Sequence, residues 1–392
     1  MDMQNKNYDF IVVGGGMVGA ACAAGLAQLG CKIFVVERSP LPHFAEGQEY
    51  DLRISAISLG SVNLLEQLGA WEYIKTRRVC PYRHLSTWEI DGFSATFSAT
   101  ELQLSELGYM VENQLIQEGL WQQFQSLPNV DYCTDTEIKK AERTQQWQLT
   151  LANGETICSP RVIAADGANS QWRELAGIGI TGWRYQQDCL LILVDTEAEQ
   201  QDITWQQFYP TGPRALLPLQ GKQACLVWYD TSEKIAQLQQ LSMQQLTQAI
   251  TEAFPKRLGK IAAIKCGGFA LTRRHAQQYY KNGMILVGDA AHSIHPLAGQ
   301  GVNLGFKDVK CLLENVQAAL KQASGLNQDD FLKRYQRQRY YDNLLMQSTM
   351  DVFYKTFRSP LLPMKIARNL ALLTAERAGM VKRKALKYAL GL

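Results

Sequence analysis

The alternation of apolar and polar positions predicts that this chain begins with a strand, a helix and a second strand. Residues 8–13 form an apolar run, three glycines follow, and the sequence stays apolar as far as Gly30. A second short apolar run ends in Glu37-Arg38. Short apolar runs bounded by turn residues are typical of buried strands, and the longer uncharged stretch between them is typical of a buried helix.

The middle of the chain is predicted to be rich in strands. Hairpins are predicted at residues 85–99, turning at Asp91-Gly92, and at residues 147–158, turning at Asn153-Gly154 before a strand at 161–165. Four aromatic and β-branched runs predict an antiparallel sheet from residues 189–194, 204–209, 215–219 and 225–229. The remaining pattern predicts helices at 58–68, 111–124 and near 232–254, a buried strand at 284–287, and helices from Val302 almost to the end.

The composition indicates a soluble globular protein with more than one structural unit. The 392 residues are 46% hydrophobic and 20% charged. Nine cysteines are scattered singly. An odd number without paired spacing argues against a disulfide framework and gives no support to a metal site. A reducing cytoplasm fits this cysteine usage best.

Charge is distributed unevenly along the chain. The net charge is +3, but residues 331–392 hold thirteen Lys/Arg and three Asp/Glu and so carry +10, which leaves −7 for residues 1–330. Within this basic end, four apolar residues recur at helical spacing: Leu362, Ile366, Leu370 and Leu373. Lys365 and Arg368 fall on another face. Two interpretations are open, a helix that lies on an anionic bilayer or a helix that packs on the core. Nucleic acid is not an expected partner, because neither an aromatic-rich basic platform nor a zinc motif accompanies the tail.

The first predicted turn carries a dinucleotide-binding fingerprint. Gly14, Gly16 and Gly19 follow the G-x-G-x-x-G spacing between a strand and a helix. Gly14 permits the tight turn, Gly16 lets the backbone approach a pyrophosphate, and Gly19 lets helix and strand pack closely. The helix start presents amides and the positive end of its dipole to the phosphates. Glu37, 23 residues after Gly14, has the spacing of an acid that hydrogen-bonds a ribose hydroxyl.

Two later motifs place aspartates at the ends of predicted strands. Residues 162–170 read Val-Ile-Ala-Ala-Asp-Gly-Ala-Asn-Ser, so Asp166 follows an apolar strand. Residues 285–296 read Ile-Leu-Val-Gly-Asp-Ala-Ala-His-Ser-Ile-His-Pro, and Asp289 follows a strand in the same way. The glycine-rich loop 297–303 then leads into a helix, whose N-terminus favours an anion.

With these three motifs in this order, the chain resembles the single-component flavoprotein aromatic hydroxylases, the family of para-hydroxybenzoate hydroxylase, over its whole length. The resemblance implies an α/β fold with an α+β insert. A Rossmann-like, parallel-sheet FAD-binding domain is expected from residues 1–75, 106–180 and 276–330, because the motifs lie in the early, middle and late parts of the chain. An inserted antiparallel β-sheet domain for the substrate is expected at 76–105 and 181–275, and a basic helical C-terminal region at 331–392.

The resemblance also implies which residues bind FAD. The first motif would hold the ADP half through Gly14, Gly16, Gly19, Glu37 and Arg38. Asp166, Gly288 and Asp289 belong to the second and third motifs, and Asp289 would take a ribityl hydroxyl. Backbone amides near the flavin pyrimidine ring would come from Gly301, Val302 and Asn303. Arg53 matches an arginine beside the pyrophosphate, or is a surface arginine, and Asn113 falls where the family has a longer polar residue touching the cofactor.

Three residues are candidates for a part in catalysis. Pro296 would shape the oxygen pocket at the C4a edge of the flavin. His295, or His292, would handle the proton of a substrate hydroxyl, since histidine titrates in a suitable range. The alternative for both histidines is a local hydrogen bond within the turn.

Within the family, the chain is similar to the ubiquinone-biosynthesis hydroxylases, and most to those acting on 2-polyprenyl-3-methyl-6-methoxy-1,4-benzoquinol. The segments that carry this similarity include 51–58, 108–113, 205–208, 212–215 and 271–275. It implies an FAD-dependent monooxygenase that hydroxylates a polyprenyl benzoquinol with O2 and transient NAD(P)H, through a flavin C4a-hydroperoxide. A single fingerprint fits one bound FAD and a visiting NAD(P)H.

Two alternatives stay open at this point: a sister hydroxylase of another ring position, and a non-catalytic flavin-binding subunit of a ubiquinone-synthesis complex. The expected location is the cytoplasm, with peripheral contact to the inner face of the bacterial cytoplasmic membrane and to other ubiquinone-biosynthesis proteins.

Overall fold

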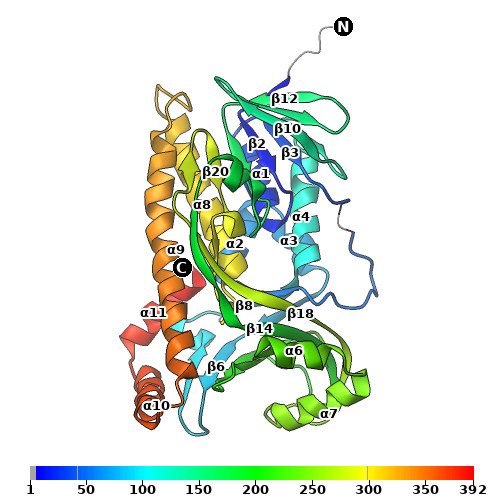
Figure 1. Ribbon diagram of the computed structural model, residues 1–392, viewed down its shortest axis with the longest axis vertical. Coiled ribbons are helices and arrows are strands. Elements are labelled where there is room, and N and C mark those ends of the chain that lie inside the picture. The colour runs from blue at the N-terminus through cyan, green and yellow to red at the C-terminus, as the bar shows by residue number, and fades with distance from the viewer. Residues whose placement is uncertain (1–5, 42, 298) are drawn as a thin grey trace.

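A six-stranded, mostly parallel sheet forms the upper part of the molecule (Figure 1). The computed structural model describes residues 6–41, 43–297 and 299–392. Five strands of this sheet run parallel, and only the edge pair β19–β20 is antiparallel. In spatial order the strands are β19 (Tyr280–Lys281), β20 (Met284–Leu286), β13 (Val162–Ala164), β2 (Phe10–Val13), β3 (Ile33–Val36) and β9 (Val130–Cys133).

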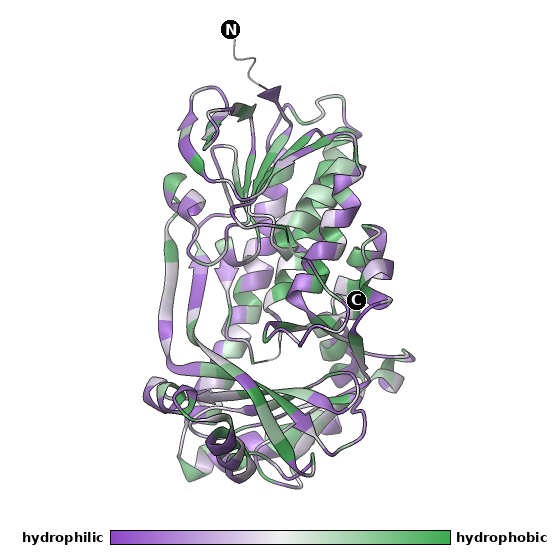
Figure 2. Ribbon diagram, turned by 90° about the vertical axis from the view of Figure 1, so that its right-hand side faces the viewer, coloured by the Kyte–Doolittle hydropathy of each residue, from purple (hydrophilic) through white to green (hydrophobic). Residues whose placement is uncertain are grey.

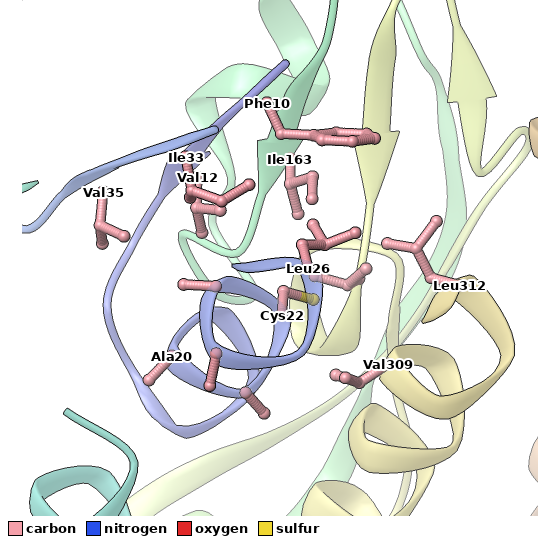
Figure 3. Packing of buried hydrophobic residues seen from close by; sticks show 14 of the residues in the cluster. Phe10, Val12, Ala20, Cys22, Leu26, Ile33, Val35, Ile163, Val309 and Leu312 are labelled. Atoms are coloured by element: carbon pink, nitrogen blue, oxygen red, sulfur yellow. The ribbon is translucent and has the colours of Figure 1, made fainter. Parts of the chain in front are cut away.

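Helix α1 (Met17–Gln28) packs on this sheet and is flanked by α4 (Asn113–Gln125) and α8 (Gly301–Leu320). Cys22 and Leu26 lie on the side of α1 that faces the strand side chains, as Figure 3 shows, and both are completely buried. Buried strands of this kind need apolar residues on both faces: in β2, Phe10 and Val12 supply one face, and Ile11 and Val13 supply the other. Hydrophobic colour is accordingly concentrated in these strands and the helices beside them (Figure 2).

Two smaller sheets and four short helices complete this part. The sheets are β1 (Lys6–Asn7), β12 (Thr156–Ser159), β11 (Trp147–Leu151) and β10 (Ile138–Arg143), and β4 (Ile54–Ser58), β8 (Gly108–Glu112) and β5 (Val79–Tyr82). The short helices are α2 (Leu59–Gln67), α3 (Trp71–Lys75), α5 (Gln171–Leu175) and the 3-10 turn η2 (Gly288–Ala290).

An eight-stranded sheet forms the lower part, with α6 (Ser232–Gln239) and α7 (Met243–Ala253) on one face (Figure 1). Trp88, Trp205 and Trp228 pack under these helices. The strands in order are β21 (His292–Ser293), β18 (Ile261–Ala276), β14 (Ile180–Thr196), β17 (Gln223–Asp230), β16 (Arg214–Pro218), β15 (Ile203–Gln207), β6 (His84–Trp88) and β7 (Ser94–Ser98), followed by the 3-10 turn η1 (Ala99–Leu102).

The chain ends in three helices: α9 (Asp330–Arg358), α10 (Leu362–Glu376) and α11 (Met380–Leu390). The long α9 runs beside both sheets, and α10 lies at its far end against β7 (Figure 1). None of the helices in the described part of the chain combines the length and the hydropathy that spanning a bilayer requires.

The fold class predicted from the sequence is confirmed, with local corrections. The predicted helix near 232–254 is two helices, because Ser242 forms a capping box with Gln245 and starts a new helix. The predicted helix at 111–124 begins at Asn113, since Val111 and Glu112 end β8. The inserted sheet is not wholly antiparallel, because β15 and β6 pair in parallel.

The division into domains stays a prediction, although two strands bear on its boundaries. β21 lies in the segment assigned to FAD binding but pairs with β18 of the eight-stranded sheet. β5 lies in the segment assigned to the insert but pairs with β8. The two regions therefore exchange short strands at their junction.

Candidate active site

Four parallel strands bring the residues of all three motifs to one edge of the sheet. Val13 is in register with Val36 of β3 and Ala164 of β13, and Ala164 is in register with Leu286 of β20. The residues that follow these strand ends are Gly14, Glu37, Asp166, Gly288 and Asp289. In open α/β sheets, ligands bind outside the carboxyl ends of the strands.

The first turn requires glycine at two positions for steric reasons. Gly14 has φ +99°, and a Cβ there would lie 2.5 Å from the Ala165 carbonyl oxygen. A Cβ on Gly19 would lie 1.9 Å from the Gly14 carbonyl oxygen. Gly16, the N-cap of α1, is different, because among the described residues no atom beyond its chain neighbours and its own helix lies within 4 Å of its Cβ position. The turn is closed toward the protein and open at Gly16.

Glu37 is buried and ties the end of β3 to the glycine turn. Its Oε2 accepts from the Gly15 amide at 2.5 Å, and its Oε1 accepts from the Ser39 amide at 2.8 Å. Each oxygen keeps a lone pair for a further donor such as a ribose hydroxyl. Arg38 is exposed beside it.

Helix α4 supports the same turn through two side chains that the sequence analysis missed. Trp121 Nε1 and Gln117 Nε2 both donate to the Gly15 carbonyl oxygen, at 2.7 and 2.9 Å. Their spacing of four residues on a predicted helix was the available signal, because residues i and i+4 share a face.

Asp166 and Arg173 connect the second motif to the third. Asp166 Oδ1 is buried without a hydrogen-bond partner among the described residues. Arg173 is buried and donates to the carbonyl oxygens of Ala168 and Ala290, at 3.3 and 3.2 Å. Arg173 therefore holds the two strand-end loops together, while Asp166 keeps an oxygen for a ligand.

A buried charged cluster fixes the turn that carries Asp289. The Gly288 amide donates to Asp308 Oδ2 at 3.0 Å, and Gly288 has φ +57°. Asp308 Oδ2 lies 2.5 Å from His292 Nε2, and Asp308 Oδ1 accepts from Arg339 Nε at 2.7 Å. Burial alone would raise the pKa of Asp308, but His292 and Arg339 outweigh it and lower the pKa to about 2. His292 thus pairs with α8 through Asp308, and its role as a proton carrier stays a prediction.

Asp289 itself is exposed, although its neighbours Gly288 and Ala290 are buried. The surrounding protein raises the pKa of Asp289 by desolvation, and Asp308 adds to the effect. Because Asp289 is exposed, its carboxyl oxygens are available as acceptors.

The N-terminus of α8 lies beside β4 and is held there by Asn303. Asn303 Oδ1 accepts from the Ser58 amide and the Ser61 hydroxyl, at 2.9 and 2.7 Å. Its Nδ2 donates to the carbonyl oxygens of Ala56 and Gly299. The Asn303 side chain is therefore fully used within the protein. What remains for a ligand are the first amides of the helix, at Gly301, Val302 and Asn303, which have no intrahelical acceptor.

The structure also brings Arg53 and Asn113 together next to this helix start. The Asn113 amide donates to the Arg53 carbonyl oxygen at 2.9 Å, and Asn113 Oδ1 accepts from the Ser55 hydroxyl at 2.6 Å. The Arg53 side chain is exposed. Val18 of α1 lies close to Gly288 of η2 and to Gly305 of α8. The N-termini of α1 and α8 therefore converge on the strand-end edge.

His295 is completely buried between three tyrosine rings. The rings of Tyr185, Tyr229 and Tyr354 lie 4.7, 5.5 and 5.4 Å from it. Neither ring nitrogen has a hydrogen-bond partner in the described part of the chain. The local hydrogen bond considered from the sequence is therefore absent from this region. Burial lowers the pKa of His295 to about 3, below its ordinary value of 6.5, and its catalytic role stays a prediction.

The sequence analysis did not find the polar network behind this histidine. The Tyr185 hydroxyl donates to Asp351 Oδ1 at 2.5 Å, and Arg273 forms an ion pair with the same carboxylate, with its Nε 2.8 Å from Asp351 Oδ2. The Tyr229 hydroxyl donates to the Pro296 carbonyl oxygen at 3.2 Å, which holds the loop of Pro296 against β17. Tyr185, Tyr229 and Asp351 come from distant segments, so local spacing gave no signal.

These residues fit FAD on three structural observations. The space at Gly16 is open where a pyrophosphate would approach, Asp166 keeps a buried oxygen without a partner, and the α1 and α8 N-termini point to one edge. Helix N-termini favour phosphates and other negative charge. The fold and this edge define an FAD-binding protein.

Comparison with known proteins agrees. The chain belongs to the FAD binding domain family, which matches residues 7–342. It is 50% identical over 392 residues to 3-demethoxyubiquinol 3-hydroxylase of Escherichia coli K12, covering 100% of both chains. It is 32% identical to the ubiquinone hydroxylase UbiL of Rhodospirillum rubrum, over 99% of this chain and 90% of the relative.

The same fold occurs in the solved structure of p-nitrophenol 4-monooxygenase PnpA from Pseudomonas putida DLL-E4. The TM-score is 0.79 at 17% identity, over 98% of each chain. The chain is accordingly an FAD-dependent monooxygenase of the branch that contains the ubiquinone hydroxylases. Because the chain is an enzyme of this class, the alternative of a non-catalytic flavin-binding subunit is wrong.

Proposed function

We propose that this enzyme hydroxylates the ring of a polyprenyl benzoquinol in ubiquinone biosynthesis, taking electrons from NAD(P)H and oxygen from O2. The observation that carries the proposal is the 50% identity to 3-demethoxyubiquinol 3-hydroxylase over the full length of both chains. The substrate is then a benzoquinol of the 2-polyprenyl-3-methyl-6-methoxy type. FAD, when bound, supplies hydride acceptance and oxygen activation.

In this proposal the strand-end edge holds the cofactor. The turn at Gly14, Gly16 and Gly19 takes the pyrophosphate, and Glu37 accepts from a ribose hydroxyl, with Arg38 and Arg53 near the phosphates. Asp166 and Asp289 would hold the middle of the cofactor. The amides of Gly301, Val302 and Asn303 stabilise negative charge at the end nearest α8, and Asn113 orients the β4 edge beside them.

The substrate ring is then placed between the Pro296 loop and the eight-stranded sheet. His295 is neutral because its pKa is about 3, so it offers one donor and one acceptor instead of a transferable positive charge. We assign it to hydrogen-bond a ring hydroxyl of the quinol. Tyr185, Tyr229 and Tyr354 exclude water around it and fix its ring plane.

The cellular location that fits this substrate is the inner face of the cytoplasmic membrane, because a polyprenyl tail resides in the bilayer. NAD(P)H binds transiently, because the single dinucleotide-binding fingerprint of the sequence is assigned to FAD. Other ubiquinone-biosynthesis proteins are proposed partners on the same reasoning.

The test is NAD(P)H oxidation by the purified holoenzyme with and without a short-chain 3-methyl-6-methoxy-1,4-benzoquinol, with mass spectrometry of the product. Stimulated oxidation together with a singly hydroxylated product supports the proposal. Product from a phenol precursor but not from the quinol would assign the enzyme to another ring position. Deleting the gene in its own host should cause the same benzoquinol to accumulate.

A further inference from the structure

Helix α10 turns its apolar side outward. Leu362, Ile366 and Leu370 are 67, 53 and 51% exposed and lie on one face of the helix, which we call the α10 stripe. Pro363 and Ala367, which lie along the same side, are also exposed. An ordinary surface helix shows the reverse arrangement, with polar residues toward solvent. The core-packing interpretation from the sequence is therefore wrong for these residues.

The inward side of α10 is polar and firmly anchored. Arg368 is 4% exposed, and its Nε donates to Glu89 Oε2 at 2.7 Å. Asn369 Nδ2 donates to the same oxygen at 2.6 Å, and Leu372 beside them is buried. Because these contacts fix the rotation of the helix, α10 cannot roll to bury the stripe without breaking a buried ion pair.

Other exposed apolar side chains lie on the helices next to the stripe. Isolated exposed apolar residues are ordinary, whereas a concentration of them marks an interaction surface. The group on the end of α9, on the α9–α10 connection and at the start of α11 consists of Val352, Phe353, Leu361, Met380 and Val381.

The same helices are strongly basic. Residues 352–392 contain nine Lys/Arg and one acid, Glu376. Arg368 and Lys382 are buried in ion pairs with Glu89, Glu101 and Glu376. The other seven are exposed or half-exposed, and among the described residues none of them pairs with a carboxylate: Lys355, Arg358, Lys365, Arg377, Arg383, Lys384 and Lys387.

From this combination we propose that α10 docks on a bilayer of anionic lipids, with the α10 stripe in the acyl boundary and the basic side chains at the headgroups. An exposed apolar face with basic residues is the pattern of interfacial helices. A second copy of the chain fits less well, because two such faces would bring like charges together.

The docked helix lies next to the candidate active site. Its inner residue Leu372 belongs to an apolar cluster with Phe357 and Phe208, whose rings stack at 3.7 Å, and with Leu297. Leu297 follows Pro296 directly. A polyprenyl tail reaching from the bilayer to the Pro296 loop would pass along this cluster. This part of the inference rests on the proposed function, whereas the lipid contact does not.

The test is sedimentation of the full-length holoenzyme with vesicles of phosphatidylcholine alone and of an equimolar mixture with phosphatidylglycerol. We expect binding to the mixed vesicles that weakens with salt. The double variant Ile366→Ser/Leu370→Ser should bind at least about tenfold more weakly, because two apolar side chains no longer leave water. Arg383→Ser/Lys384→Ser should lose about fivefold per residue. Leu175→Ser on α5, which removes a 51% exposed leucine elsewhere, should bind like the wild type.

Three results would overturn the docking proposal: no binding of the wild type to the mixed vesicles, unchanged binding of the stripe variant, or a dimer in solution that the stripe variant abolishes. Turnover of a short-chain quinol separates the two proposals. If the wild type binds vesicles but does not hydroxylate the quinol, the proposed function fails and the docking surface stands. If the stripe variant hydroxylates the short-chain quinol normally but no longer binds the mixed vesicles, both the proposed function and the docking surface stand.

Discussion

Replacing Arg339 by methionine should destabilise the enzyme more than any exposed change on the same helix. Arg339 Nε donates to Asp308 Oδ1, and its other nitrogens donate to Asp342 and Asn343. Asp308 is completely buried. Removing the arginine leaves this carboxylate, among the described residues, with the Gly288 amide, His292 and Asn343 as its hydrogen-bonding partners. Breaking a buried ion pair from one side costs about 3–5 kcal/mol of unfolding free energy.

The effect should reach the cofactor, because Asp308 also accepts from the Gly288 amide at 3.0 Å. If the loop of Asp289 loses the stabilisation of about one hydrogen bond, near 1.4 kcal/mol, the affinity for FAD falls about tenfold. Urea unfolding of the apoprotein at pH 7 measures the first quantity, and fluorescence titration with FAD measures the second. Arg337→Met is the matched control, since Arg337 is exposed on the same helix.

Two further measurements sharpen this test. The double variant Arg339→Met/Asp308→Asn should recover part of the loss, because the uncompensated charge is gone. In the wild type, the stability that Asp308 contributes is present above its ordinary pKa of 3.8 and is lost as the pH falls toward about 2. If Arg339→Met unfolds within 1 kcal/mol of Arg337→Met, the charged cluster is not what fixes this turn, by the magnitude expected for buried pairs of about 3–5 kcal/mol.

Other predictions address the cofactor edge and the buried histidine. Asp289→Ala should lose bound FAD and activity together, and full flavin absorbance in the purified variant would refute the ribityl assignment. Gly19→Ala should fail to fold or lose several kcal/mol of unfolding free energy, on the order of 3, because its Cβ would lie 1.9 Å from a carbonyl oxygen. Gly16→Ala should change stability by only about 1 kcal/mol but should weaken the binding of FAD. Thermal melts with and without FAD compare the two variants. His295→Phe should lower turnover of the quinol at least tenfold, or about 1.4 kcal/mol, without moving the pH profile of kcat. Because the folded pKa of His295 is about 3, acidification from its ordinary pKa of 6.5 destabilises the wild type, and the phenylalanine variant should lose less stability on titration from pH 6.5 to 5.

Features set by neighbours in sequence could be predicted. The turns at Gly92 and Gly154 follow their dipeptides, and both glycines have positive φ. The strand-end positions of Glu37, Asp166 and Asp289 follow from short apolar runs, and parallel pairing aligns them.

Features set by tertiary pairing could not be predicted in the same way. Strand β18 runs from Ile261 to Ala276, but Gly267-Gly268 and several charged residues interrupt its alternation, so no strand was expected there. It forms because β14 pairs with it along nearly its whole length. Asp308 and Arg339 lie 31 residues apart on two helices, and only their packing makes them a buried pair. The outward turn of the α10 stripe depends likewise on Glu89, which is distant in the chain.

The order of the strands has a consequence for how the enzyme is made. β2 and β3 leave the ribosome early, but β20 and the start of α8, which complete the same edge, follow almost 300 residues into the chain. Ligands stabilise only states that contain their whole site, so FAD gives little help to the nascent chain. During synthesis the first βαβ unit therefore stays without ligand and with apolar strand faces exposed. Such exposed apolar surface makes it a substrate for chaperones.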